Sequence, residues 1–199
     1  MNFLAHIYLS GNNNDLRFGN FIADSIRGKQ YQDFSPSVQK GIFLHREIDT
    51  FTDQHPIFRQ HCKLFFPEHG HYARVIMDVV YDHFLALNWE QYHPDPLEDF
   101  IAAFYKSTAA RSEDIPIKML PLFNSMQQQN WLLQYASING LENILRHMSK
   151  RTSFPAQFDR AIPIIVPVSI PGMARGRTWW STACILDAPT PRAASRMEG

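Results

Sequence analysis

The sequence predicts an all-α protein with a single helical domain and an irregular C-terminal tail. Apolar residues recur at intervals of three and four along most of the chain, which is the spacing of one helix face. Proline and glycine separate these periodic stretches, and no stretch shows the strict alternation of a half-buried strand. With 199 residues, of which 45% are hydrophobic, the chain can build one domain around one core.

End signals separate the helices that we predict in the first half. Asn2 can cap the first helix, and Gly28 can close the second. Pro36 stands at the first position of the third helix, and Pro56 restarts the chain in the fourth. These signals predict helices over residues 1–9, 16–28, 36–54 and 56–66.

The second half begins with a long, strongly apolar segment, which Pro94 and Pro96 end. Amphipathic segments follow it up to a basic cluster near residue 150. The predicted helices of this half cover residues 69–92, 96–110, 123–137 and 141–152.

The composition changes after residue 160. Residues 162–199 hold five of the 13 prolines, contain neither lysine nor histidine, and lose the amphipathic pattern. We therefore divide the chain into a helical domain at 1–160 and a tail at 161–199. The tail is expected to be disordered or loosely docked, or to replace the natural end after a reading-frame change. A functional extension is less favoured because the tail carries no chemical motif.

Charge and cysteine content narrow the class of protein. The formal net charge is zero, which argues against a nucleic-acid-binding protein that relies on bulk charge. Cys62 and Cys184 form no CxxC motif and are too few for a disulfide framework. No apolar run approaches the roughly 20 residues of a membrane span. We expect a soluble, cytoplasmic protein with neither a nucleic-acid nor a membrane partner.

The segment FLHREIDTFTDQHP, at 43–56, combines packing residues with chemical ones. His45, Asp49 and Asp53 are spaced four apart, so they share one helix face, while Leu44 and Ile48 point elsewhere. The spacing predicts an apolar packing face and a second face of imidazole and carboxylates.

Other helices offer similar groups. Asp78, Asp82 and His83 are embedded in an apolar run, where ionised carboxylates are unfavourable unless paired or bound to metal. The alternatives are an ion pair with Arg46 or Arg74, or exposure at a helix end.

Asn20 and Asp24 are also four apart, and His6 lies on the first helix, where a lone histidine is more often a core residue. Helical bundles build metal sites from such converging side chains. Mixed imidazole and carboxylate ligands suit Mn²⁺, Fe²⁺, Zn²⁺ or Mg²⁺, and the absence of nearby cysteines argues against structural zinc.

A basic cluster, Arg146, Lys150 and Arg151, ends the last predicted helix. It is either a solvated helix terminus, which the helix dipole favours, or a docking patch for an anionic partner.

Five motifs resemble one known family. MNFLAHIYLS, GNFIADSIRGK, GIFLHREIDTFTDQHP, MDVVYDHFLALNW and GLENILRHMSKRT are similar, in order and spacing over about residues 1–155, to the acyl carrier protein phosphodiesterases, or holo-ACP hydrolases. The resemblance implies a helical fold related to the HD-domain metal-dependent phosphohydrolases. It also implies hydrolysis of the phosphodiester between 4′-phosphopantetheine and a serine of holo-acyl carrier protein, with Mn²⁺ or Mg²⁺. The matching positions are His6, Asp24, His45, Asp49, Asp53, His55, Asp82 and His83.

From chemistry we expect a metal-activated water and the following roles. The metal ligands are Asp24, His45, Asp49 and Asp82; the catalytic candidates are His83, His55, Asp53 and Arg46; the docking candidates for an acidic carrier protein are Arg146, Lys150 and Arg151, with Arg27 and Lys29. A phosphohydrolase for nucleotides or other small phosphoesters, or a non-catalytic helical binding module, remain as alternatives.

Overall fold

The computed structural model describes residues 3–149 and 158–169, and within these ranges it is all-α, as predicted. The α-helices are α1 (Phe3–Leu9), α2 (Asn14–Ile22), α3 (Pro36–Gln54), α4 (Pro56–His69), α5 (Ala73–Leu87), α6 (Leu97–Ala109), α7 (Leu120–Gln128), α8 (Trp131–Gln134), α9 (Ile138–Ser149) and α10 (Ile162–Ser169). Short 3-10 turns lie at Ala23–Ser25, Gln30–Asp33, Gly70–Tyr72, Trp89–Gln91, Ser112–Asp114 and Phe158–Ala161. None of the described helices is both long and apolar enough to cross a membrane.

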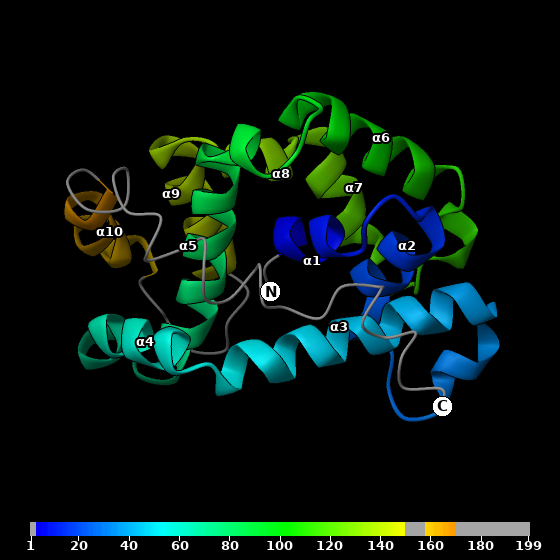
Figure 1. Ribbon diagram of the computed structural model, residues 1–199, viewed down its shortest axis with the longest axis horizontal. Coiled ribbons are helices and arrows are strands. Elements are labelled where there is room, and N and C mark those ends of the chain that lie inside the picture. The colour runs from blue at the N-terminus through cyan, green and yellow to red at the C-terminus, as the bar shows by residue number, and fades with distance from the viewer. Residues whose placement is uncertain (1–2, 150–157, 170–199) are drawn as a thin grey trace.

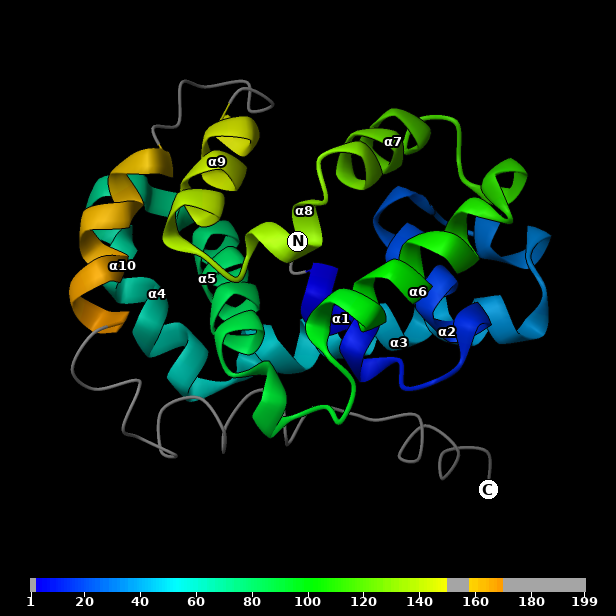
Figure 2. The ribbon, with the colours of Figure 1, turned by 90° about the horizontal axis from the view of Figure 1, so that it is seen from above.

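Helix α1 lies at the centre of the molecule. Figure 1 shows α3 running along one edge with α1 and α2 packed above it, and Figure 2 shows α1 between α5 on one side and α2 with α6 on the other. The apolar side chains of this short helix are almost completely buried, with Leu4 and Ile7 at 0% exposure. A helix of seven residues is stable only through such packing, so α1 depends on its neighbours for its conformation.

Two glycines bring α2 and α3 into close contact. A β-carbon added to Gly19 would lie 2.1 Å from the carbonyl oxygen of Val38, and one added to Gly41 would lie 2.4 Å from that of Leu16. Only hydrogen fits between these backbones. The close approach brings the side chains of α2 against the polar face of α3.

Helix boundaries differ from the predicted ones where local caps act. Asn13 accepts hydrogen bonds from the backbone amides of Asp15 and Leu16, so α2 begins at Asn14, before the predicted start at residue 16. The predicted helix at 123–137 is two helices, because Asn130 adopts a left-handed conformation with φ of 48°. The predicted helix at 69–92 is α5 flanked by two 3-10 turns.

The helical fold also continues past the predicted domain boundary at residue 160. Ala161 and Ile165 are 0% and 1% exposed, and α10 packs against α9. The first part of the predicted tail, Ile162–Ser169, is therefore helical, and residues 170–199 lie outside the described residues.

We expect Gly19→Ala to lower the free energy of unfolding by about 1–3 kcal/mol, because the added methyl group must push α2 from α3. Urea unfolding measures this. Gly28→Ala is the matched control: it meets no atom within 4 Å and has only the strain of its φ of +55°. Equal stability of the Gly19→Ala and wild-type proteins would contradict the close approach.

Candidate metal centre

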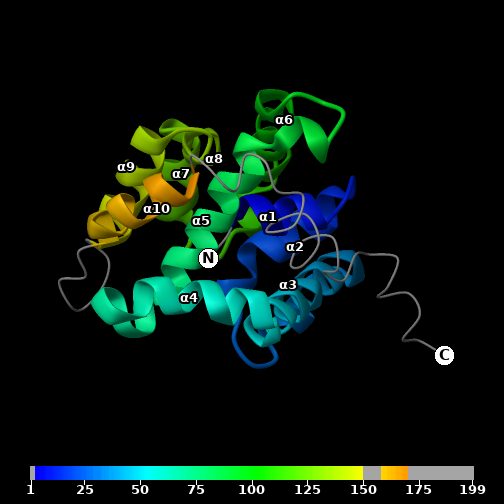
Figure 3. The same cartoon turned by 60° about the vertical axis from the view of Figure 1, so that its left-hand side comes forward.

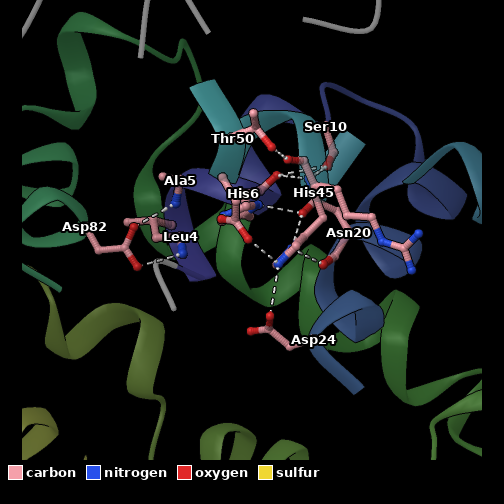
Figure 4. Close-up of polar contacts among 11 residues, drawn as sticks. Leu4, Ala5, His6, Ser10, Asn20, Asp24, His45, Thr50 and Asp82 are labelled. Atoms are coloured by element: carbon pink, nitrogen blue, oxygen red, sulfur yellow. Dashed lines mark hydrogen bonds and ion pairs between the residues drawn. The ribbon is translucent and has the colours of Figure 1, made fainter. Parts of the chain in front are cut away.

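Two buried histidines meet where α1 and α3 cross. The rings of His6 and His45 are stacked, with centroids 4.2 Å apart and an interplanar angle of 26°. The whole residues His6 and His45 are 3% and 7% exposed. Figure 4 shows both rings beside Asn20 of α2, so three helices contribute to one polar cluster inside the bundle.

The side-chain amide of Asn20 fixes the protonation of both rings. Its Nδ2 donates hydrogen bonds to the His6 carbonyl oxygen and to Ser10 Oγ, each at 3.0 Å. Its Oδ1 therefore faces the imidazoles, 2.7 Å from His6 Nδ1 and 3.0 Å from His45 Nδ1. An oxygen acceptor requires N–H donors, so the hydrogen-bond network assigns a proton to each Nδ1. In a neutral ring, Nε2 then carries only a lone pair.

Both Nε2 atoms face carboxylate oxygens. His6 Nε2 is 3.2 Å from Asp49 Oδ1, while His45 Nε2 is 3.2 Å from both Asp49 Oδ2 and Asp24 Oδ1. The His6 contact has the distance of an ion pair but lacks hydrogen-bond geometry. A lone pair that faces an anionic oxygen is repelled unless a proton or a cation lies between them. The group formed by His6, His45, Asp24 and Asp49 thus requires a positive charge among these four side chains.

A divalent metal fits this requirement. Ligand atoms of His6, His45 and Asp49 all lie within 4.8 Å of one another, and Asp24 flanks His45. Ligands at roughly 2.0–2.1 Å from one ion are separated by about 3 Å, close to the observed nitrogen–oxygen distances. The two carboxylates also balance the charge of a divalent ion. His6, His45 and Asp49 therefore fit a metal site with two imidazole ligands and one carboxylate ligand, and Asp24 flanks it through its contact with His45.

Titration favours ionised carboxylates at neutral pH. The contact with His45 lowers the pKa of Asp24. Burial raises the pKa of Asp49, but the hydrogen bond and charge attraction from His45 outweigh burial and hold it well below the usual range. Burial lowers the pKa of His45, yet Asp24 and Asp49 raise it to about 9. Without a metal, His45 therefore carries the positive charge.

The centre opens to solvent on its carboxylate side. The side chains of Asp24 and Asp49 are 46% and 53% exposed, whereas those of His6 and His45 are 3% and 9% exposed. A bound ion would thus have a buried imidazole side and an accessible carboxylate side, from which a substrate can approach.

Comparison with known proteins places the chain in a family. The sequence model of the acyl carrier protein phosphodiesterases matches residues 1–168. An acyl carrier protein phosphodiesterase of Shigella boydii serotype 18 is 36% identical over 152 residues, which are 76% of this chain and 79% of the relative. One from Escherichia coli O139:H28 is 35% identical over the same shares.

The chain belongs to the acyl carrier protein phosphodiesterase family. All four residues of the centre lie within the matched range of the family. No solved structure matches the chain, so the relation to HD-domain enzymes remains a prediction.

Asp82 has a different place from the one expected. Its two carboxylate oxygens accept hydrogen bonds from the backbone amides of Leu4 and Ala5, at 3.0 and 2.9 Å. Figure 4 shows it at the start of α1, on the side away from His45. Burial raises its pKa to about 7 despite these two bonds. Asp82 caps the central helix, and the structure does not bring it to the metal centre.

His83 is also part of the core. Its Nδ1 lies 2.6 Å from the carbonyl oxygen of Tyr135, and the residue is 0% exposed. Burial lowers its pKa, which favours the neutral ring. The described contacts place it at the packing of α5 against the chain after α8, so a role as general acid has no geometric support.

The other catalytic candidates have structural contacts. Asp53 forms an ion pair with Arg74, at 2.6 Å, so the predicted His45–Asp49–Asp53 face divides after Asp49. His55 caps α4 through a 3.3 Å bond from the Ile57 amide to its Nδ1. Arg46 is exposed and lies over the ring of Phe43, 5.6 Å from its centroid.

The docking candidates lie in two regions. Arg146 is exposed on α9 and pairs with Glu142 of the same helix. Lys150 and Arg151 lie outside the described residues. Arg27 and Lys29 are exposed, and they follow Asp24, which lies on the open side of the centre, by three and five residues in the sequence.

The metal ligands predicted from the sequence do not include His6, and no role is predicted for Asn20 or Ser10. The i,i+4 pair Asn20–Asp24 was the available signal in the sequence. Asn20 holds both rings and Asp24 contacts one of them, so the spacing predicted the location but not the separate roles.

In metal-free protein, the contribution of His45 to stability should be lost as the pH rises. Its folded-state pKa is raised, so the contribution is complete below about pH 6.5, the unfolded value, and disappears through about pH 9. Urea unfolding with a chelator should therefore show a smaller decline for His45→Gln than for wild type over this range. His147→Gln on α9 is the control and should keep the wild-type slope. Parallel profiles for all three proteins would contradict the assignment.

Asp82→Ala should lower the free energy of unfolding by about 1–3 kcal/mol, because two buried backbone amides lose their acceptor. Asp99→Ala, at an exposed position of α6, should change it by less than about 0.5 kcal/mol. A variant at Asp82 that keeps its stability but no longer binds metal would show that this carboxylate is a ligand.

Proposed function

We propose that this chain hydrolyses the phosphodiester that joins 4′-phosphopantetheine to a serine of holo-acyl carrier protein, and releases apo-carrier protein and 4′-phosphopantetheine. The observation that carries the proposal is that His6 Nε2 and His45 Nε2 each lie 3.2 Å from carboxylate oxygens of Asp49 or Asp24, in a member of this family. That arrangement suits a cation, which can neutralise charge on the phosphate during hydrolysis.

The chain supplies the site in three parts. His6 and His45 bind from the buried side, and Asn20 holds a proton on each Nδ1, so that Nε2 is the nitrogen available to a metal once His45 gives up its second proton. Asp24 and Asp49 bind from the open side, where their ionised carboxylates balance the ion. A divalent ion bound here would polarise a phosphoryl oxygen and lower the pKa of a bound water.

The ligand set favours Mn²⁺ over Mg²⁺. Two imidazoles among four protein ligands are uncommon for Mg²⁺, which prefers oxygen ligands and retains several waters. Carboxylates together with imidazoles are typical of Mn²⁺ and Fe²⁺ sites. We therefore propose Mn²⁺ as the working ion.

We place this activity in the cytoplasm. Cys62 is a free thiol, which fits a reducing compartment.

The exposure of the carboxylate side fits a protein substrate. The phosphodiester is attached directly to a serine side chain, so the carrier protein itself must approach the ion. Asp24 and Asp49 lie at the surface rather than at the bottom of a deep cavity, and they leave room for that approach.

Asp49→Ala and Asp24→Ala should each reduce Mn²⁺-dependent release of 4′-phosphopantetheine by at least about 100-fold, because each removes a ligand. Mass spectrometry of holo-carrier protein before and after incubation measures the release. Asp99→Ala is the matched control and should keep the wild-type rate. Wild-type activity after removal of metal by a chelator would contradict the metal centre.

A small diester, bis(p-nitrophenyl) phosphate, separates the two kinds of phosphohydrolase. Activity on the small diester without release from holo-carrier protein would favour a small-phosphoester enzyme. Absence of both activities, together with absence of bound metal, would favour a binding module.

A further inference from the structure

A pocket of about 240 Å³ lies between α4 and the start of α5. Four of its lining residues can carry positive charge, namely Arg59, Lys63, His71 and Arg74, and none is acidic. Phe58 forms part of its wall and Phe66 part of its rim. We call it the α4 basic pocket.

The positive charge of the α4 basic pocket is largely uncompensated. Arg74 pairs with Asp53, but no ion pair involves Arg59 or Lys63 among the described residues. Glu68 is exposed on the same helix, although it does not line the pocket. Since the whole chain has a formal net charge of zero, this is a local concentration of charge that would attract an anionic partner.

An exposed aromatic side chain accompanies the charges. Phe66 is 59% exposed on the rim of the pocket, and Leu64 of the same helix is 49% exposed. A large apolar side chain in water beside arginine is a combination enriched in protein–protein interfaces. Charge and exposed apolar surface together favour a protein partner over a small anion.

The pocket begins close to the metal centre. Asp53 follows Asp49 by one turn of α3, about 6 Å along the helix. Arg59 Nε donates a 2.9 Å hydrogen bond to the Asp53 carbonyl oxygen, and Arg74 pairs with the Asp53 carboxylate. Figure 3 shows α4 continuing from the end of α3 on the same side of the molecule. A substrate bound at Asp49 would therefore reach the pocket with its neighbouring surface.

We propose that the α4 basic pocket receives an acidic surface of the carrier protein and so positions the serine-linked phosphodiester at the metal centre. The inference rests on the proposed function. Because the scissile bond is on the serine itself, the surface around that serine must contact the enzyme within a few residues of Asp24 and Asp49. Arg59 and Lys63 supply cations that form no ion pair among the described residues, and Arg59 reaches the last turn of α3 through its bond to the Asp53 carbonyl oxygen. The pantetheine arm is uncharged and gives no reason for four basic groups.

The test measures binding of fluorescently labelled apo-acyl carrier protein, which has no phosphodiester and no arm. Arg59→Glu combined with Lys63→Glu reverses two charges of the pocket. The matched control, Lys106→Glu combined with Lys118→Glu, reverses two exposed charges on and near α6 and changes the net charge equally. Fluorescence anisotropy at low and high ionic strength gives the Kd, and circular dichroism checks the fold.

We expect the pocket variant to raise the Kd about tenfold or more at low salt, and the control to change it less than about twofold. The difference should shrink at high salt because the charges are exposed and screened. Phe66→Ser should also weaken binding, with little dependence on salt. Equal effects of the two charge variants, or no effect of either, would overturn the proposal.

Two further outcomes have distinct meanings. Weaker binding of holo-carrier with unchanged binding of apo-carrier would assign the pocket to the pantetheine arm instead, and would also overturn the proposal. If wild-type protein neither binds nor cleaves any carrier protein, the proposed function fails, and this inference fails with it. Binding and cleavage that do not respond to the α4 variants would overturn only the inference.

Discussion

The side-chain amide of Asn20 joins three helices through its hydrogen bonds. It donates to the backbone and a hydroxyl of the α1 region and accepts from imidazoles of α1 and α3. Because an amide has a donor end and an acceptor end, its orientation decides the tautomer of both histidines. The assignment of the two Nε2 atoms as the metal-facing nitrogens follows from that orientation. With the opposite orientation, the two Nε2 atoms would carry protons and could not bind a metal.

The backbone contact of α2 and α3 makes this arrangement possible. Gly19 and Gly41 allow the two helices to approach closely, and Asn20 follows Gly19 directly, so its side chain reaches His45. The same approach gives the network little freedom to rearrange, since packed helices do not shift independently. A site that is ordered before the metal binds loses less conformational entropy on binding. The close packing of α2 against α3 and the hydrogen-bond geometry of Asn20 therefore both favour metal binding at this centre.

Acidic residues serve two different purposes in this fold. Asp82 is completely buried and satisfies the first amides of α1, whereas Asp24 and Asp49 lie at the surface and remain ionised. Embedding in an apolar run indicated that Asp82 needed a partner, and it has one. The partner is a helix terminus rather than an ion. Since α1 carries His6, the cap at Asp82 also helps to hold one of the ligands in place.

The sequence alone determined the helical class and most helix positions, and it predicted where the chemistry lies, because these depend on local spacing: apolar period, caps, and the i,i+4 pairs His45–Asp49 and Asn20–Asp24. The family could also be identified from the order of its motifs. Tertiary structure decided which polar groups meet. Local spacing cannot tell that Asp53 turns to Arg74, that Asp82 caps a helix 77 residues earlier, or that His6 stacks on His45. These contacts join helices far apart in the chain, and their partners are set by how closely the helices pack and at what angle they cross, which no single segment specifies.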